Sequence, residues 1–219
     1  PFVAEFTAKY AGYDCQQGAH DYNKACDAAR KCAADFDWDA IVPNMVYVWT
    51  GLTQAIGLRY YGIPGIHIPP DTGFQYREPP EDKAFMRADE YDLLIDDPTD
   101  YLLHYYLPRV AGGLRGFAKL MSPLDMVEIV GGPPWMMRWA DPDVQASLEK
   151  LTAAGREAAA WGGKVYPLLG RLVAEGFPGL FSLMSLAPFD LICDTSRGTR
   201  SMLMDMFRQP DALLEACDR

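Results

Sequence analysis

Apolar residues recur at every third or fourth position in several stretches of the chain, the spacing of one face of an α-helix. The clearest stripe consists of Tyr22, Ala25, Cys26, Ala29, Cys32, Ala33 and Phe36. We therefore predict a helix from Asp21, with its cysteines as small core residues. By contrast, residues 1–20 have no clean period and are predicted to form an extended arm.

Proline, glycine and aspartate mark where further helices begin and end. Helix starts are predicted at Asp89, Asp97-Pro98, Asp141-Pro142, Thr199 and Gln209-Pro210-Asp211. A helix of residues 110–130 is expected to break at Ser122-Pro123. The helix that follows Asp141 is expected to break at Gly162-Gly163 and to resume over 164–175. Residues 131–139 are predicted to be a turn, and residues 59–90 a loop or hairpin.

Two short apolar runs indicate β-strands. Residues 180–186 are too short and too uniformly apolar for a surface helix, so we predict a buried parallel strand there. Pro188 ends this run, because proline cannot donate to a sheet ladder. Residues 40–42 are the candidate first strand, followed by a short helix that Gly57 closes. A strand, a polar turn and a helix then form a βα unit, with the polar residues where α/β barrels place their chemistry.

Residues 187–189 (Ala-Pro-Phe), a polar turn, and residues 203–215 (LMDMFRQPDALLE) resemble the uroporphyrinogen decarboxylase superfamily. Residues 36–42 with 54–58 are similar to its first strand and following turn, and residues 89–98 to a helical segment before its second strand. The resemblance implies an α/β fold, a (β/α)8 barrel. Because the chain offers few strands and many helices, we expect residues 1–219 to be one helix-rich domain, the N-terminal portion of such a barrel. The remaining strands are then expected after Arg219.

Composition limits the partners. The formal net charge of −10 argues against a nucleic-acid or anionic-membrane surface. No apolar run is long enough to span a bilayer. The five cysteines form no CxxC pair, so we expect no disulfide framework, no zinc site within this chain, and a reducing cytoplasm.

The polar turn of residues 190–200 is the best candidate for chemistry. The family decarboxylase has a tyrosine six residues after its proline, where this chain has Asp194, so Asp194 is the candidate catalytic residue. Asp190, Arg197 and Arg200 are candidate substrate-binding residues, with an arginine holding an anionic group near the positive end of the next helix. In the structural alternative, Asp194 caps a helix and pairs with Arg197. Asn44 stands where the decarboxylase has an essential carboxylate, and is a further candidate substrate-binding residue.

Other polar residues are assigned to packing. His67 lies in an apolar alternation and His104 on an aromatic face, so both are predicted to be packed histidines. The glycines at positions 112, 113 and 116 allow close packing. Their segment is not a phosphate loop, because it lacks the Lys-Ser/Thr ending and a preceding strand.

Three functions follow from the resemblance. The first is the cobalamin-linked methyltransferase or demethylase branch, where zinc activates a thiol that accepts a methyl group from a corrinoid, and a corrinoid protein is a partner. The second is uroporphyrinogen decarboxylation in porphyrin biosynthesis, and the third is a non-catalytic ligand-binding barrel. Three features of the sequence favour the methyltransferase branch over the decarboxylase. Residues 1–20 lack an arginine, residues 43–49 lack a carboxylate, and Asp194 replaces the tyrosine. The resemblance implies that the zinc ligands of this branch follow Arg219, so this chain alone is expected to be inactive. The expected substrate is a small molecule or a corrinoid-bound molecule. A homodimer is compatible with the family.

Overall fold

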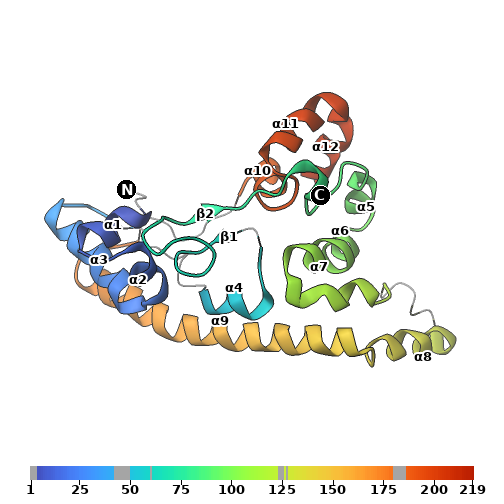
Figure 1. Cartoon of the computed structure of the whole chain (residues 1–219), viewed down its shortest axis with the longest axis horizontal. Coiled ribbons are helices and arrows are strands. Elements are labelled where there is room, and N and C mark those ends of the chain that lie inside the picture. The colour runs from blue at the N-terminus through green and yellow to red at the C-terminus, as the bar shows by residue number, and fades with distance from the viewer. Residues whose placement is uncertain (1–3, 42–49, 60, 123–125, 127, 180–185) are drawn as a thin grey trace. The chain divides into compact units, whose positions relative to one another are not determined.

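The computed structural model describes residues 4–41, 50–59, 61–122, 126, 128–179 and 186–219 (Figure 1). The chain divides into two compact units, which are described separately. Unit 1 comprises Pro1–Ala55, Tyr61–Gln75 and Ala153–Ser185, and unit 2 comprises Ile56–Tyr60, Tyr76–Thr152 and Leu186–Arg219. The helix-rich character predicted from the sequence is confirmed. The assignment of residues 1–219 to one domain stays a prediction.

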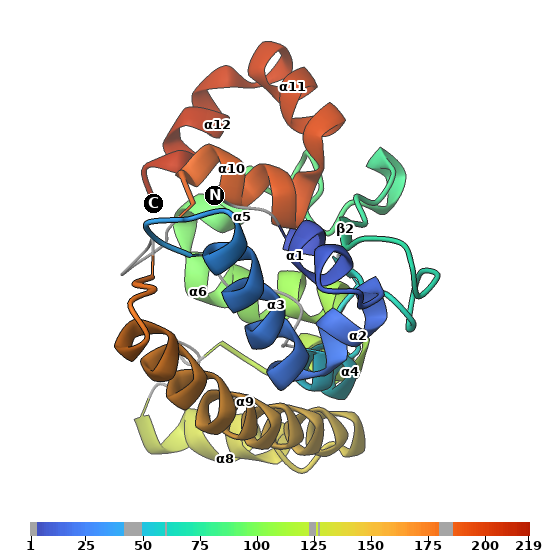
Figure 2. The ribbon, with the colours of Figure 1, turned by 90° about the vertical axis from the view of Figure 1, so that its left-hand side faces the viewer.

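Unit 1 is built on helices from both ends of its sequence. It contains α1 (Ala4–Tyr10), α2 (Cys15–His20), α3 (Tyr22–Asp35), nearly all of α4 (Thr50–Ile56) and the C-terminal part of α9 (Pro142–Ala174). Both views place α1, α2 and α3 side by side (Figure 2). Strands β1 (Tyr61–Gly62) and β2 (Gln75–Tyr76) pair in a two-stranded sheet, which confirms the predicted loop or hairpin.

Unit 2 is a set of short helices. It contains η2 (Glu81–Lys83), α5 (Tyr91–Asp96), α6 (Pro98–Tyr101), η3 (Leu102–Tyr106), α7 (Leu107–Val110), η4 (Gly112–Lys119), α8 (Glu128–Arg138), the start of α9, α10 (Pro188–Ile192), η6 (Cys193–Arg197), α11 (Thr199–Arg208) and α12 (Pro210–Cys217). Helices η3 and η6 are π-helices, and η4, within the stretch predicted to be helical, is a 3-10 helix. Proline occupies the first turn of α6 and α12, as predicted from Asp97-Pro98 and Gln209-Pro210.

The prediction of an extended arm over residues 1–20 is wrong, because the described part of this stretch, residues 4–20, contains α1 and α2. Asp14 caps α2: its side chain accepts a hydrogen bond from the Gln17 backbone N–H, and the Gln17 side chain accepts one from the Asp14 backbone N–H. This reciprocal pair satisfies two backbone donors that a helix start leaves open. The Asp-x-x-Gln spacing was visible in the sequence and was the signal for this helix.

Two predicted breaks are also corrected. Residues 128–138 form α8 rather than a turn, and Trp135 is fixed there by a hydrogen bond from its Nε1 to the Met121 carbonyl oxygen (3.2 Å). Helix α9 runs without interruption through Gly162-Gly163 and contains Pro167. Burial of Leu168 and Leu172 anchors its C-terminal half. These packing contacts come from distant segments, so the local pattern did not reveal them.

A parallel β-bridge joins Ile41 to Gly179 within unit 1. The Ile41 backbone N–H donates to the Pro178 carbonyl oxygen at 3.0 Å, and Ile41 is buried with Ala29, Ala33 and Leu172. The bridge therefore lies within one predicted strand and immediately before the other. Residues 42 and 180–185 of those strands lie outside the described residues, so the predicted buried strand stays a prediction. Leu186, at the end of that run, is exposed.

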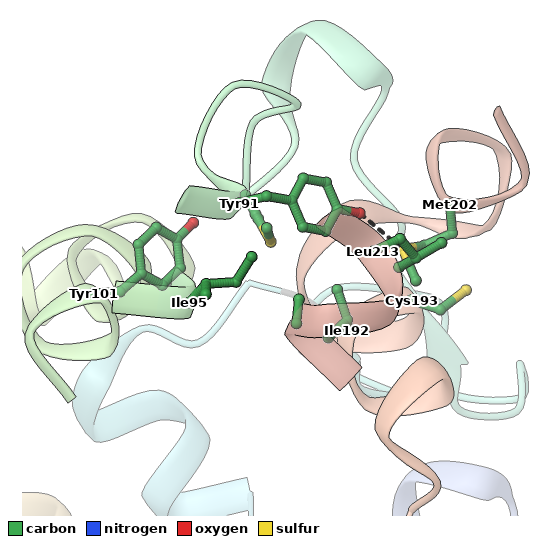
Figure 3. Packing of buried hydrophobic residues seen from close by; sticks show 9 residues of the cluster. Tyr91, Ile95, Tyr101, Ile192, Cys193, Met202 and Leu213 are labelled. Atoms are coloured by element: carbon green, nitrogen blue, oxygen red, sulfur yellow. Dashed lines mark hydrogen bonds between the residues drawn. The ribbon is translucent and has the colours of Figure 1, made fainter. Parts of the chain in front are cut away.

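The core of unit 2 closest to the polar turn gathers side chains from α5, α6, η6, α10, α11 and α12 (Figure 3). Its buried members are Met86, Tyr91, Ile95, Tyr101, Ile192, Cys193, Met202, Leu213 and Ala216. This cluster fixes α10 and η6 against α11, and so holds the backbone of the predicted site in place.

Candidate functional site

The predicted polar turn consists of helix α10 followed directly by π-helix η6. Pro188 begins α10 in its first turn, where its missing N–H costs no hydrogen bond. Gly198 ends η6 with a φ of 79°, a left-handed conformation that glycine adopts without strain, and α11 starts at the next residue. Insertions of this π type are frequent at functional sites. The segment therefore has defined geometry throughout.

Three of the predicted site residues have side chains open to solvent. Asp190 and Arg200 are exposed, and Asp194 is half-buried. None of the three makes a hydrogen bond or ion pair within the described part of the chain. Their charges are therefore available to a ligand. Asn44 lies outside the described residues, so its role stays a prediction.

Arg197 occupies a different environment, with a side chain only 1% exposed. Its Nε and Nη2 atoms each lie 2.7 Å from Oδ2 of Asp205, which is fully buried, and its Nη1 donates to the Met86 carbonyl oxygen at 2.9 Å. The ion pair thus joins η6 to α11, and Arg197 pairs with Asp205 instead of the predicted Asp194. A buried guanidinium with these contacts serves to hold the turn, and solvent does not reach it.

Tyr91 completes this buried cluster. Its hydroxyl donates to Oδ2 of Asp205 at 3.0 Å. The same hydroxyl lies 3.5 Å from the Met202 sulfur (Figure 3). Burial raises the pKa of Tyr91, and the adjacent Asp205 carboxylate raises it further, so the phenol stays protonated. The sequence did not predict this partnership, because Tyr91 and Asp205 lie 114 positions apart.

A second ion pair, between Glu90 and Arg109, lies in the same unit. It is bidentate, with Nη1–Oε2 and Nη2–Oε1 distances of 2.6 and 2.7 Å. The Tyr101 hydroxyl and the Arg87 backbone N–H also donate to Oε2 of Glu90. Burial opposes ionisation of Glu90, but these hydrogen bonds and the Arg109 charge outweigh it and lower its pKa to about 2. The pair joins the start of α5 to α7.

The N-terminus of α11, predicted to help bind an anion, holds a carboxylate of this chain. Glu78 accepts hydrogen bonds from the Thr199 backbone N–H (3.1 Å) and the Thr199 hydroxyl (2.7 Å). A carboxylate is favourable there because the first N–H groups of a helix carry partial positive charge. Glu78 therefore occupies the position next to Arg200 that the sequence assigned to a ligand.

The thiol of Cys193 beside the turn is buried, whereas His67, one of the two histidines predicted to be packed, is exposed. Burial raises the pKa of Cys193, and Asp194 and Asp190 contribute to the increase, so the thiol stays neutral. His67 Nδ1 accepts a hydrogen bond from the Ile63 backbone N–H at 3.2 Å, but the residue is exposed, so the prediction of a packed histidine is wrong for His67. His104 Nδ1 lies 2.8 Å from Asp100 Oδ1, a contact that the sequence reasoning missed.

The chain matches no model of a protein family, and searches of curated proteins and of solved structures find no match either. Among the helices that the structure describes, none combines the length and the apolar character needed to cross a bilayer.

Proposed function

We propose that this chain is the N-terminal portion of a (β/α)8 barrel of the uroporphyrinogen decarboxylase type, and that the whole protein belongs to the cobalamin-linked methyltransferase branch. The observation that carries the proposal is the parallel bridge between Ile41 and Gly179. Adjacent parallel strands are what a barrel of this type requires of its first two strands. The bridge supports that pairing, because Ile41 lies in one predicted strand and Gly179 immediately precedes the other.

In this proposal, the ligand binds past Pro188, at the open side chains of α10, η6 and α11. Arg200 holds an anionic group of the substrate, because its guanidinium is exposed and makes no ion pair within the described chain. Asp194 is the carboxylate assigned to the reaction, and Asp190 lies four residues before it. Arg197 positions the turn through Asp205 and does not touch the ligand.

Zinc and a corrinoid belong to the branch as a whole. The described residues include no group of three histidine, cysteine or acidic side chains placed to hold a metal ion. The described residues therefore do not by themselves supply a zinc site.

The experiment that tests the function uses the full-length protein. Zinc content and methyl transfer from methylcobalamin to a thiol are measured, with uroporphyrinogen turnover as the competing activity. Methyl transfer supports the proposal. Turnover of uroporphyrinogen instead would place the protein in the decarboxylase branch, and neither activity would favour the non-catalytic barrel.

The site is tested by Arg200→Ala in the same protein. We expect weaker binding of the anionic substrate, by about tenfold or more, because a charge-assisted hydrogen bond is lost. Arg208→Ala is the matched control: it removes the same charge at the other end of α11, where Arg208 makes an exposed ion pair with Glu81. Equal affinities of the two variants would remove Arg200 from the site.

A further inference from the structure

A groove with a volume of about 590 Å3 lies in unit 2, between η4 and the first turns of α9. This volume is within the range of roughly 300–1,000 Å3 that small-molecule pockets have. Helix α9 lines it with Asp143, Ala146, Ser147 and Lys150, which share one helical face because they are spaced by three and four residues. The opposite wall is formed by Arg115 and by the glycines at positions 112, 113 and 116.

The two walls are held together by close contacts. The Gly116 backbone N–H donates to Oγ of the buried Ser147 at 2.9 Å. A Cβ atom on Gly116 would lie 2.0 Å from the Asp143 carbonyl oxygen, so only glycine permits this approach. Val144 of α9 is buried in one apolar cluster with Leu114 and Phe117 of η4. The groove is therefore preformed, and binding does not require its walls to be ordered first.

The charges that face the groove favour an anion. Its carboxylate, Asp143, is already paired with Lys119 at 2.5 Å. Arg115 uses only its Nε in a hydrogen bond, to the Gly112 carbonyl oxygen at 3.2 Å, so its terminal nitrogens remain available. Lys150 is exposed and makes no hydrogen bond or ion pair within the described residues. Two available cations thus line one groove of a chain whose formal net charge is −10.

We propose that this groove binds a small organic anion through a phosphate or carboxylate head group. The planar Arg115 guanidinium supplies paired donors, and the Lys150 ammonium supplies a second positive charge. The glycine backbone and Ala146 leave room beside them for the organic part of the ligand. Recognition is by side-chain charge, in contrast to a phosphate loop, whose sequence signature is absent. The site does not depend on the proposed methyltransferase function or on Arg200.

Pyrophosphate and citrate are the probes for this site, because they carry the two head groups on small molecules. Each is titrated into the 15N-labelled chain at low ionic strength and followed by two-dimensional NMR. We expect saturable shifts of the Gly112, Gly113 and Gly116 amide signals. We also expect binding to weaken as salt is added, because exposed charges are screened. The probe that binds more tightly identifies the preferred head group.

Variants distinguish a specific anion-binding site from general electrostatic attraction of the anion to the chain. Lys150→Gln and Arg115→Gln are each expected to raise the dissociation constant about tenfold. Ala146→Leu keeps both charges but fills part of the groove, and should also weaken binding. Arg156→Gln is the matched control, because it makes the same charge change at an exposed position of α9 outside the groove, and it should alter the constant less than twofold.

Two results would overturn the proposal. One is the absence of saturable glycine shifts with both probes. The other is an Arg156→Gln variant that loses as much affinity as Lys150→Gln, which would mean that general charge attracts the anion. The unfolding midpoint of each variant is measured alongside, so that loss of the groove's structure is distinguished from loss of its charge.

Discussion

The buried ion pair between Arg197 and Asp205 gives the sharpest prediction about the architecture of unit 2. The substitution Asp205→Asn keeps the size of the side chain but removes its negative charge. The Arg197 guanidinium, only 1% exposed, then stays charged and buried without a counterion. Removing one partner of a buried pair costs about 3–5 kcal/mol, because the remaining charge has lost its hydration and is not compensated.

For a chain of 219 residues, each kcal/mol lowers the unfolding midpoint by roughly 2–4 °C, so the expected loss is about 6–20 °C. Urea unfolding followed by circular dichroism measures the free energy directly. The matched control is Glu81→Gln, which breaks the exposed ion pair with Arg208 (side chains 43% and 53% exposed). That control should cost at most about 1 kcal/mol.

A double variant shows where the cost arises. Arg197→Met together with Asp205→Leu removes both charges and fills the space with apolar atoms. It should be much closer in stability to the parent chain than Asp205→Asn is, because no unpaired charge remains. If Asp205→Asn lowers the free energy of unfolding no more than Glu81→Gln does, the Arg197–Asp205 pair is not desolvated. The positioning role assigned to Arg197 would then be wrong.

The remaining predictions test other parts of the fold. Glu90 has its pKa lowered from 4.5 to about 2, so its pair with Arg109 contributes fully above pH 4.5 and is lost between pH 4.5 and 2. This lowering of the pKa corresponds to at most about 3 kcal/mol, because solvent screens part of the interaction. The variant Glu90→Gln should abolish that share of the acid dependence in urea titrations. Gly116→Ala should destabilise unit 2 by about 1–3 kcal/mol through a clash with α9, measured as a lower urea midpoint. Asp14→Ala should cost about 1 kcal/mol by removing the α2 cap, detected as faster amide exchange in α2; unchanged exchange would contradict this role.

Local sequence signals predicted two helices that begin at an aspartate cap, α3 and α6, but the cap of α2 was missed. Asp21 precedes α3, and its side chain accepts hydrogen bonds from the Asn23 and Lys24 backbone N–H groups, so the start of the predicted helix is confirmed. Asp97 accepts one from the Asp100 N–H at the start of α6. These contacts join residues two or three positions apart, and residue type together with spacing is enough to predict them.

The wrongly predicted break in α9 arose where packing outweighs local preference. Gly162 and Gly163 each cost a helix roughly 1 kcal/mol relative to alanine, yet α9 continues through them. Burial of Val165, Leu168 and Leu172 on the following turns supplies more than that amount. Which residues of a helix will be buried depends on segments far away in the sequence, so this result was not available from the local pattern.

The candidate site shows the same difference between local features, which the sequence reveals, and non-local contacts, which it does not. The sequence predicted a polar turn over residues 190–200, whereas the structure has the helices α10 and η6 there, and the sequence could not sort the charges of this segment into structural and available ones. Arg197 and Arg200 look equivalent in the sequence, and only the fold places Asp205 and Tyr91 beside the first of them. The partner of a buried charge is a non-local property, whereas the presence of the charge is a local one.

Glu78 limits the contacts that a ligand bound at Arg200 can make. Its carboxylate already accepts two hydrogen bonds from Thr199 at the N-terminus of α11. An anionic substrate would therefore not gain the full benefit of that helix end unless it displaced Glu78. Because the Glu78–Thr199 contact is exposed, exchanging one carboxylate for another costs little desolvation. The proposed site thus relies on the Arg200 charge for affinity, and this is why the Arg200→Ala variant, compared with Arg208→Ala, is the decisive test of the turn.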